Sequence, residues 1–506
     1  MIAMNQRKVG AVLSYISFFI TNVVGLVYSP YMLRLMGQSE YGLWGVANSL
    51  IGYLSLLNFG IGGAYLRFYS RCKAQNDLEG EKRLNGTYFL IFLILAVLVL
   101  VGGSIMLMFV DVLVEQSFTA LEMQRMQIIL LLGTVNMAFT FLISVINMTI
   151  QAHEQYIYMR VSSIVFSIIN PVVNVAVLQF GGRAVALSTV ALVLSLISYV
   201  IHIIFALKVI KFRMSFKGIE FSYFKEIFVF SSFLFLNSIT EQITSSTDGV
   251  IIGAIWGTAA VSVYTVGAQF RTYFTNFSVA ISSVFSPRIN DIVARTDSNE
   301  ALDELFIRIG RIQFFILALM LIGYTAIGRD FILLYAGQDY GDAYWVGLCL
   351  ILSTFVPLFQ NVGLEIQKAK NKHKVRSVVY LLITIVNVGL TIPFTKWWGG
   401  IGAALGTLLC MFVGAVLFMN CYYAKGIGLN ILEFWKSIFS TVPGMLPSII
   451  TGVIIFTCFK LDEVWEVLVA TGVMFVIYLI PVWFFSMNDY EKELFKSPLR
   501  KILRKR

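Results

Sequence analysis

The sequence has few charged residues. Lys, Arg, Asp and Glu make up 13% of its 506 residues, whereas hydrophobic residues make up 58%. Soluble domains carry roughly 25% charged residues, so the chain lacks about half of the charge that a solvated surface requires. This deficit argues against a large soluble α-helical protein and favours an integral membrane protein.

Several chemical motifs are also missing. The five cysteines form no C-x-x-C pair, and the three histidines have no ligand partner at helical spacing, so we expect no disulfide framework, metal site or resident cofactor. No Walker-type glycine loop is present, which argues against ATP hydrolysis. The net charge of +10 is not gathered on a basic face with interleaved aromatics, so nucleic acid is not an expected partner.

Long apolar stretches fill most of the chain. Each is long enough to cross about 30 Å of hydrocarbon as a helix, and all connections between them are short. The sequence therefore predicts an all-α polytopic membrane protein of about fourteen transmembrane helices. The expected spans are 9–33, 41–69, 85–110, 124–151, 157–180, 184–207, 226–255, 259–287, 304–327, 343–366, 377–395, 401–424, 438–459 and 465–486.

The basic residues are distributed unevenly among the connections. Most of the 38 Lys and Arg residues lie in alternate connections and in the two ends of the chain, including the cluster 368–376. Cytoplasmic loops of membrane proteins carry such an excess. We therefore expect both termini in the cytoplasm, and the basic charge to contact membrane lipids.

The chain repeats itself after about 213–220 residues. Residues 181–189 match 399–407 through a shared Gly-Gly-x-x-x-Ala-Leu-x-Thr pattern, and 37–44 match 257–264 more weakly. A repeat of six spans inserts both halves in the same direction. We expect two six-helix lobes, 1–212 and 213–430, related by a pseudo-two-fold axis along the membrane normal, with helices 13 and 14 and a basic tail in 431–506.

Four segments carry a resemblance to a known family. They are Leu35-Met36-Gly37-Gln38-Ser39-Glu40-Tyr41-Gly42-Leu43-Trp44, Asp248-Gly249-Val250-Ile251-Ile252-Gly253, Gln367-Lys368-Ala369-Lys370-Asn371-Lys372 and Gly399-Gly400-Ile401-Gly402-Ala403-Ala404. Through them the chain resembles the polysaccharide-transport (Wzx-like) flippases of the multidrug/oligosaccharidyl-lipid/polysaccharide exporter superfamily. The resemblance implies two lobes around a cavity, in a bacterial cytoplasmic membrane.

The resemblance also implies a function. It implies transfer of a polyprenyl-pyrophosphate-linked oligosaccharide from the inner to the outer leaflet by alternating access, with a polysaccharide polymerase and glycosyltransferases as further partners. Lipid II flippases of this superfamily have several arginines deep in the early helices, whereas the first span here has only Arg34, near its outer end. This difference favours O-antigen, capsule or exopolysaccharide units as substrate.

Two alternatives remain open at this stage. One is a cation-coupled exporter of drugs or other small molecules from the same superfamily. The other is a membrane-embedded enzyme of envelope polysaccharide synthesis. The enzyme is disfavoured because the outside connections 111–123 and 328–342 are modest, whereas such polymerases and ligases carry a long external loop.

Polar residues in span seven share one helix face. Asn237, Glu241, Ser245 and Asp248 are spaced by four, four and three residues. An ionisable group in mid-membrane costs at least about 2.5–3.5 kcal/mol, which invites a functional interpretation. The stripe is expected either to line the cavity and bind a coupling proton or sodium ion, or sugar hydroxyls, or to pair helices as a buried network.

Span eight carries Arg271 near mid-depth. We expect its planar guanidinium to bind the pyrophosphate, with Tyr264 and Thr275 on the same face; a permanent ion pair with Glu241 or Asp248 is the alternative. Asn58 in span two is expected to bond either sugar or a neighbouring helix.

A second group of arginines lies close to the predicted inner membrane surface. Each of them either places its charge at the interface or guides an anionic headgroup into the protein. These residues are Arg67, Arg160, Arg308 and Arg311.

Overall fold

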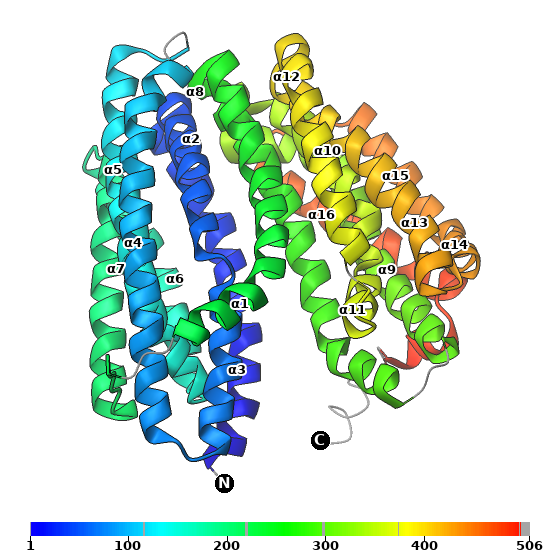
Figure 1. Cartoon of the computed structure of the whole chain (residues 1–506). Coiled ribbons are helices and arrows are strands. Elements are labelled where there is room, and N and C mark those ends of the chain that lie inside the picture. Colours follow the sequence, from blue (N-terminus) through cyan, green and yellow to red (C-terminus); the bar gives the residue numbers. More distant parts are fainter. Residues whose placement is uncertain are drawn as a thin grey trace, which may run out of the picture. The chain divides into compact units, whose positions relative to one another are not determined.

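The computed structural model describes residues 2–114, 117–217, 221–295, 299–372, 374–494 and 496 (Figure 1). These residues form helices, short turns and connections, with no strand among them. The first half contains α1 (Ile2–Met36), α2 (Gln38–Leu54), α3 (Ile61–Ala74), α4 (Leu78–Val114), α5 (Ala120–Ala152), α6 (Tyr156–Gln179) and α7 (Ala184–Phe205). The second half contains α8 (Phe221–Arg295), α9 (Glu300–Ala336), α10 (Asp342–Phe359), α11 (Asn361–Ala369), α12 (Lys374–Met411), α13 (Met419–Tyr422), α14 (Ile431–Phe439), α15 (Leu446–Cys458) and α16 (Val464–Pro481).

The helices of the described residues are consistent with the expected fourteen spans. Twelve helical stretches in the described residues are long and apolar enough to cross a membrane, and two of them, Ser238–Arg295 and Lys374–Ile427, have 58 and 54 residues. About 20 residues suffice for one crossing. The first of these stretches has a non-helical residue at Gly257 and the second at Trp398 and Gly399, so each contains two spans.

The chain divides into two compact units, Met1–Ser262 (unit 1) and Val263–Arg506 (unit 2). The division falls within α8, about fifty residues after the predicted lobe boundary at 212/213. The first part of α8 packs on unit 1: Ser117 Oγ donates to Ala254 O at 2.6 Å, and the Tyr53 and Thr247 hydroxyls share a hydrogen bond of 2.5 Å. The lobes predicted from the repeat stay a prediction.

Each unit has its own apolar core. In unit 1 the buried side chains gather from α2, α3, α4 and α5, with Tyr65, Tyr88 and Phe92 fully enclosed. In unit 2 one cluster joins α9, α15 and α16 around Ile327 and Met474, and another joins α9 to Tyr478 of α16. The two C-terminal spans are therefore packed on α9.

Unusual backbone conformations recur at the repeat distance. Gly37 has φ 80 and ψ 166, and Gly257, its predicted counterpart, has φ 78 and ψ −174. Three further pairs have positive φ in both members, a region that favours glycine. They are Gly181 with Gly399, Glu154 with Asn371, and Lys211 with Gly428. The same breaks between helices thus occur in both halves, which supports the internal repeat.

Polar contacts within unit 1 link helix ends that the topology places on one side. At the expected outer side, Glu40 pairs with Arg125 and accepts from the Ala184 N–H at 3.2 Å. At the expected inner side, Tyr65 donates to Asn85 at 2.7 Å, and Asn85 donates to Arg213 O at 2.9 Å.

In unit 2, too, a polar contact links helix ends that the topology places on one side. Asp330 of α9 accepts from the Leu461 N–H at 3.2 Å, and both lie at predicted outer ends. The up-and-down order of spans is therefore consistent inside each unit.

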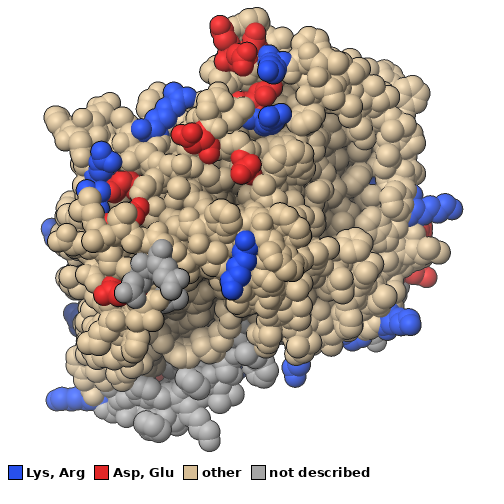
Figure 2. All heavy atoms as spheres, turned by 90° about the horizontal axis from the view of Figure 1, so that it is seen from above, with Lys and Arg blue, Asp and Glu red and all other residues tan. Residues whose placement is uncertain are grey.

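The face drawn in Figure 2 shows small groups of basic and acidic side chains separated by uncharged ones, in keeping with the low share of charge.

Candidate functional site

A seam between α2 and the first part of α8 runs through unit 1. A methyl group on Gly253 would lie 2.9 Å from Val46 Cγ2, and one on Gly249 would lie 3.0 Å from Ser49 Oγ. Small residues let helix backbones approach where lipid supplies no hydrophobic drive. The glycines of span seven therefore serve to pack this span against span two.

Polar side chains occupy the same seam, one or two turns closer to the expected inner side. The Gln242 amide donates to Ser246 Oγ at 2.5 Å, and Tyr53 of α2 bonds Thr247. Asp248 is 2% exposed. The seam thus holds a buried carboxylate among hydroxyl and amide groups.

The predicted stripe of span seven divides in the structure. Asp248 is buried, whereas Glu241 and Ser245 are exposed. No hydrogen bond or ion pair joins the Glu241 carboxylate to the described residues, and Ser245 donates to Gln242 O at 3.1 Å. The side chain of Asn237 lies outside the described residues. The two carboxylates therefore differ in exposure, and their part in binding stays a prediction.

Span two is broken near its middle, a feature that the sequence analysis missed. After α2 the chain forms a single 3₁₀ turn, Ser55–Asn58, followed by two left-handed residues, Phe59 with φ 49 and Gly60 with φ 67. The buried Asn58 Oδ1 has no hydrogen-bond partner among the residues that the structure describes. Discontinuous helices in transporters supply free backbone groups at mid-membrane. The sequence signal that could have predicted this break is the run Asn58-Phe59-Gly60-Ile61-Gly62-Gly63.

Arg271 lies in unit 2, on the second part of α8, and is partly buried. Its guanidinium makes no hydrogen bond or ion pair with the described residues, while its carbonyl accepts from Thr275 Oγ1 at 3.0 Å. Tyr264, two turns earlier, is 5% exposed and lies beside Gly400. The roles of Tyr264 and Thr275 in substrate binding stay predictions.

Neighbouring helices cover part of the span-eight face that carries Arg271. A methyl group on Gly267 would lie 2.8 Å from Ala343 O of α10. Ser278 is fully buried and donates to Leu358 O at 2.7 Å. Helical spacing shows which residues share a face but not which helix covers it.

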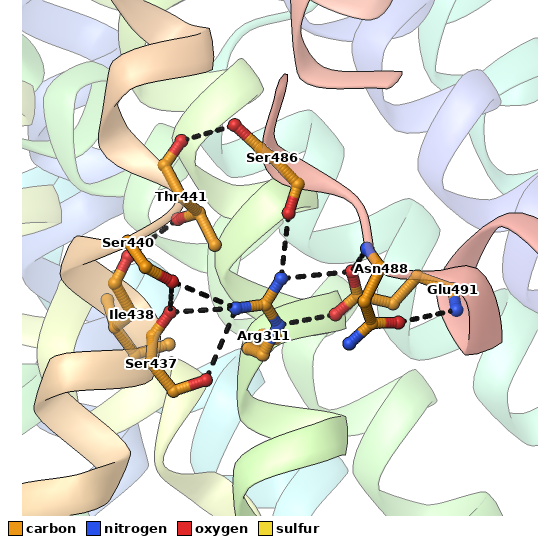
Figure 3. Close-up of polar contacts among 8 residues, drawn as sticks. All are labelled: Arg311, Ser437, Ile438, Ser440, Thr441, Ser486, Asn488 and Glu491. Atoms are coloured by element: carbon orange, nitrogen blue, oxygen red, sulfur yellow. Dashed lines mark hydrogen bonds and ion pairs between the residues drawn. The ribbon is translucent and has the colours of Figure 1, made fainter. Parts of the chain in front are cut away.

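Arg311 lies at the inner end of α9 and is enclosed by the C-terminal segments (Figure 3). Its Nε donates to Glu491 Oε1 at 2.5 Å and its Nη2 to Glu491 Oε2 at 3.0 Å. Nη2 also donates to Ser486 O, and Nη1 to Ser437 O, both at 2.8 Å. With its donors engaged by the protein, Arg311 holds helices together, and this geometry does not support a role in headgroup entry.

The other three predicted entry arginines are at the surface. Arg67 and Arg160 are exposed. Arg308 pairs with Glu304 and stacks over the Tyr490 ring at 4.5 Å. Their part in headgroup entry stays a prediction.

A family model described as "Polysaccharide biosynthesis protein" matches residues 9–293, more than half of the chain. The "Probable flippase AglR" of Haloferax volcanii is 21% identical over 397 residues, which are 78% of this chain and 79% of that protein. An "Uncharacterized membrane protein in cps region" of Klebsiella pneumoniae is 26% identical over 230 residues, 45% of this chain and 46% of that one.

Solved structures share the fold. The lipid II flippase MurJ in an inward closed conformation aligns with a TM-score of 0.71 at 16% identity, covering 97% of this chain and 99% of that one. An inward-facing multidrug resistance MATE transporter of the MOP superfamily aligns with a TM-score of 0.61 at 17% identity, covering 82% and 96%. Taken with the family match, this means that the chain belongs to the polysaccharide biosynthesis protein family and has the fold that the MurJ flippase and the MATE transporter share.

Proposed function

We propose that this protein is a flippase of the MOP superfamily, and that it moves a polyprenyl-pyrophosphate-linked oligosaccharide repeat unit from the inner to the outer leaflet of a bacterial cytoplasmic membrane. The units would serve O-antigen, capsule or exopolysaccharide synthesis, and transport would occur by alternating access. The family match and the two flippase- and capsule-region relatives support a glycan-related cargo. Both termini would be cytoplasmic, close to glycosyltransferases, and the released unit would pass to a polymerase outside.

One observation carries the substrate class. Arg271 is partly buried near the middle of a span, and its guanidinium has no partner among the described residues. A cation in that position costs several kcal/mol unless a counter-charge or water meets it. A pyrophosphate would supply that charge, and the planar guanidinium matches its oxygens in a two-pronged geometry.

Glu241 is our proposed coupling residue. It is an exposed carboxylate near the middle of span seven with no partner among the described residues. A proton or a sodium ion bound there would neutralise the charge and lower the cost of its passage through the apolar core. The broken turn at Asn58–Gly60 would add carbonyl and amide oxygens for sugar hydroxyls.

The test is deletion of the gene followed by lipid analysis. A flippase for lipid-linked units predicts accumulation of the polyprenyl-linked repeat unit on the cytoplasmic face and loss of surface polysaccharide. Reintroduction of the wild-type chain must restore both. Unchanged lipid pools combined with new sensitivity to cationic dyes would instead indicate a cation-coupled drug exporter.

A further inference from the structure

An apolar groove runs along unit 2 between the two helical segments of α12 and its continuation. It has a volume of about 700 Å³. On the first segment Val378, Leu382 and Val386 follow one another at a spacing of four, which places them on one helix face. The opposite wall carries Leu409, Val413 and Phe418. Side chains of this size and exposure require a hydrocarbon environment.

The walls of the groove are fixed by tight packing at its base. A methyl group on Gly414 would lie 2.2 Å from Ile383 Cδ1, so the two segments touch there. Thr407 of the second segment donates to the buried Asn387 Oδ1 of the first at 3.3 Å. These two contacts join the helical segments that form the walls of the groove.

One end of the groove is positively charged. Lys374 is the charged residue among the described residues that line it. It belongs to the basic cluster 368–376 at the expected inner surface, where Lys372 donates to Gly426 O at 2.7 Å and Arg376 lies 4.5 Å from the Tyr380 ring centre. Positive charge beside an apolar groove is complementary to the headgroup and chain of an anionic lipid.

The length of the groove fits a single lipid chain. The lining residues run from Lys374 to Leu390, which a helix covers in about 24 Å at ~1.5 Å per residue. The hydrocarbon core is ~30 Å thick, so one leaflet accounts for ~15 Å. The groove is therefore long enough to hold a whole acyl chain of the inner leaflet.

We propose that this groove is a binding site for one anionic phospholipid of the inner leaflet. One acyl chain lies along Val378, Leu382 and Val386, and the phosphate contacts Lys374. The site does not depend on the identity of the transported cargo.

The test is native mass spectrometry of the purified full chain with phosphatidylglycerol and phosphatidylcholine of equal chain length. Val386→Trp fills the groove and should remove most bound lipid of both kinds. Ile385→Trp is the matched control, because Ile385 is 60% exposed and Val386 55%, but only Val386 lines the groove. Lys374→Gln should lower phosphatidylglycerol retention about fivefold, equivalent to ~1 kcal/mol for one basic residue at an anionic surface, with phosphatidylcholine unchanged.

Equal lipid retention by the Val386→Trp and Ile385→Trp proteins would overturn the proposal. So would recovery of a polyprenyl phosphate, in place of phospholipid, from the wild-type chain. If Val386→Trp does not elute as a folded species, the surface variant Lys374→Gln decides: unchanged preference for phosphatidylglycerol would remove the assignment.

Discussion

Arg311 and Glu491, 180 residues apart in the chain, form a two-pronged ion pair that is almost completely buried. Two hydrogen bonds of 2.5 and 3.0 Å join them, and their side chains are 8% and 1% exposed. Glu491 also accepts from the Asn488 N–H at 2.8 Å. The pair ties the segment after α16 to the inner end of α9, and the contact with Ser437 adds the start of span thirteen.

Removing one member of this pair should destabilise unit 2. Glu491→Gln or Arg311→Ala leaves a buried charge without its partner, which typically costs about 3–5 kcal/mol. Arg308→Ala is the control, since the Arg308–Glu304 pair is roughly half-exposed and worth about 0–1 kcal/mol. Thermal unfolding in detergent, followed by tryptophan fluorescence, measures the difference. Equal midpoints for the Arg311→Ala and Arg308→Ala proteins would contradict this assignment.

Arg271→Ala should abolish flipping while protein level and membrane insertion stay near wild type. Arg271→Lys should restore transport only partly, because the planar fork is lost. Surface glycan in a deletion strain is the measurement, with immunoblotting of the membrane fraction alongside. If Arg271 instead pairs permanently with a carboxylate, single loss should lower protein level and joint neutralisation with Glu241 or Asp248 should rescue it. Full export by the Arg271→Ala protein would refute the headgroup role.

Gly60→Ala should destabilise the break in span two. Gly60 has φ 67, and a side chain in this left-handed region costs roughly 1–2 kcal/mol. Gly323→Ala provides the comparison, because Gly323 is helical and nothing lies within 4 Å of an added methyl group. That substitution should leave stability unchanged or raise it slightly. A thermal midpoint that falls equally in both variants would argue against a strained break.

The predicted orientation can be checked by labelling single cysteines with a membrane-impermeant reagent in intact cells. Replacements near Arg183 and Lys396 should react from outside, and replacements near Lys370 should react only after the membrane is opened. The chain's own cysteines, of which Cys421 and Cys458 are exposed, are replaced first. The reverse pattern would invert the topology.

The sequence allowed the spans to be predicted because each depends on local apolar length alone, and Gly257 and Gly399 ended helices where the repeat placed a break. The sequence did not allow two other features to be predicted, the burial of Ser278 against α10 and the pairing of Arg311 with Glu491. Both depend on which helices meet, and periodicity carries no information on that. The break at Asn58–Gly60 was missed, although Asn58 and the glycines after it mark it, because the spans were predicted from apolar length alone.

The division between the two units falls between Ser262 and Val263, inside α8, with helical residues on both sides. Residues on both sides of the division belong to the helical segment that follows Gly257. Arg271 lies eight residues further on, about 12 Å at ~1.5 Å per residue. The guanidinium proposed to hold the headgroup therefore lies about two helical turns beyond the point where the chain passes from one unit to the other.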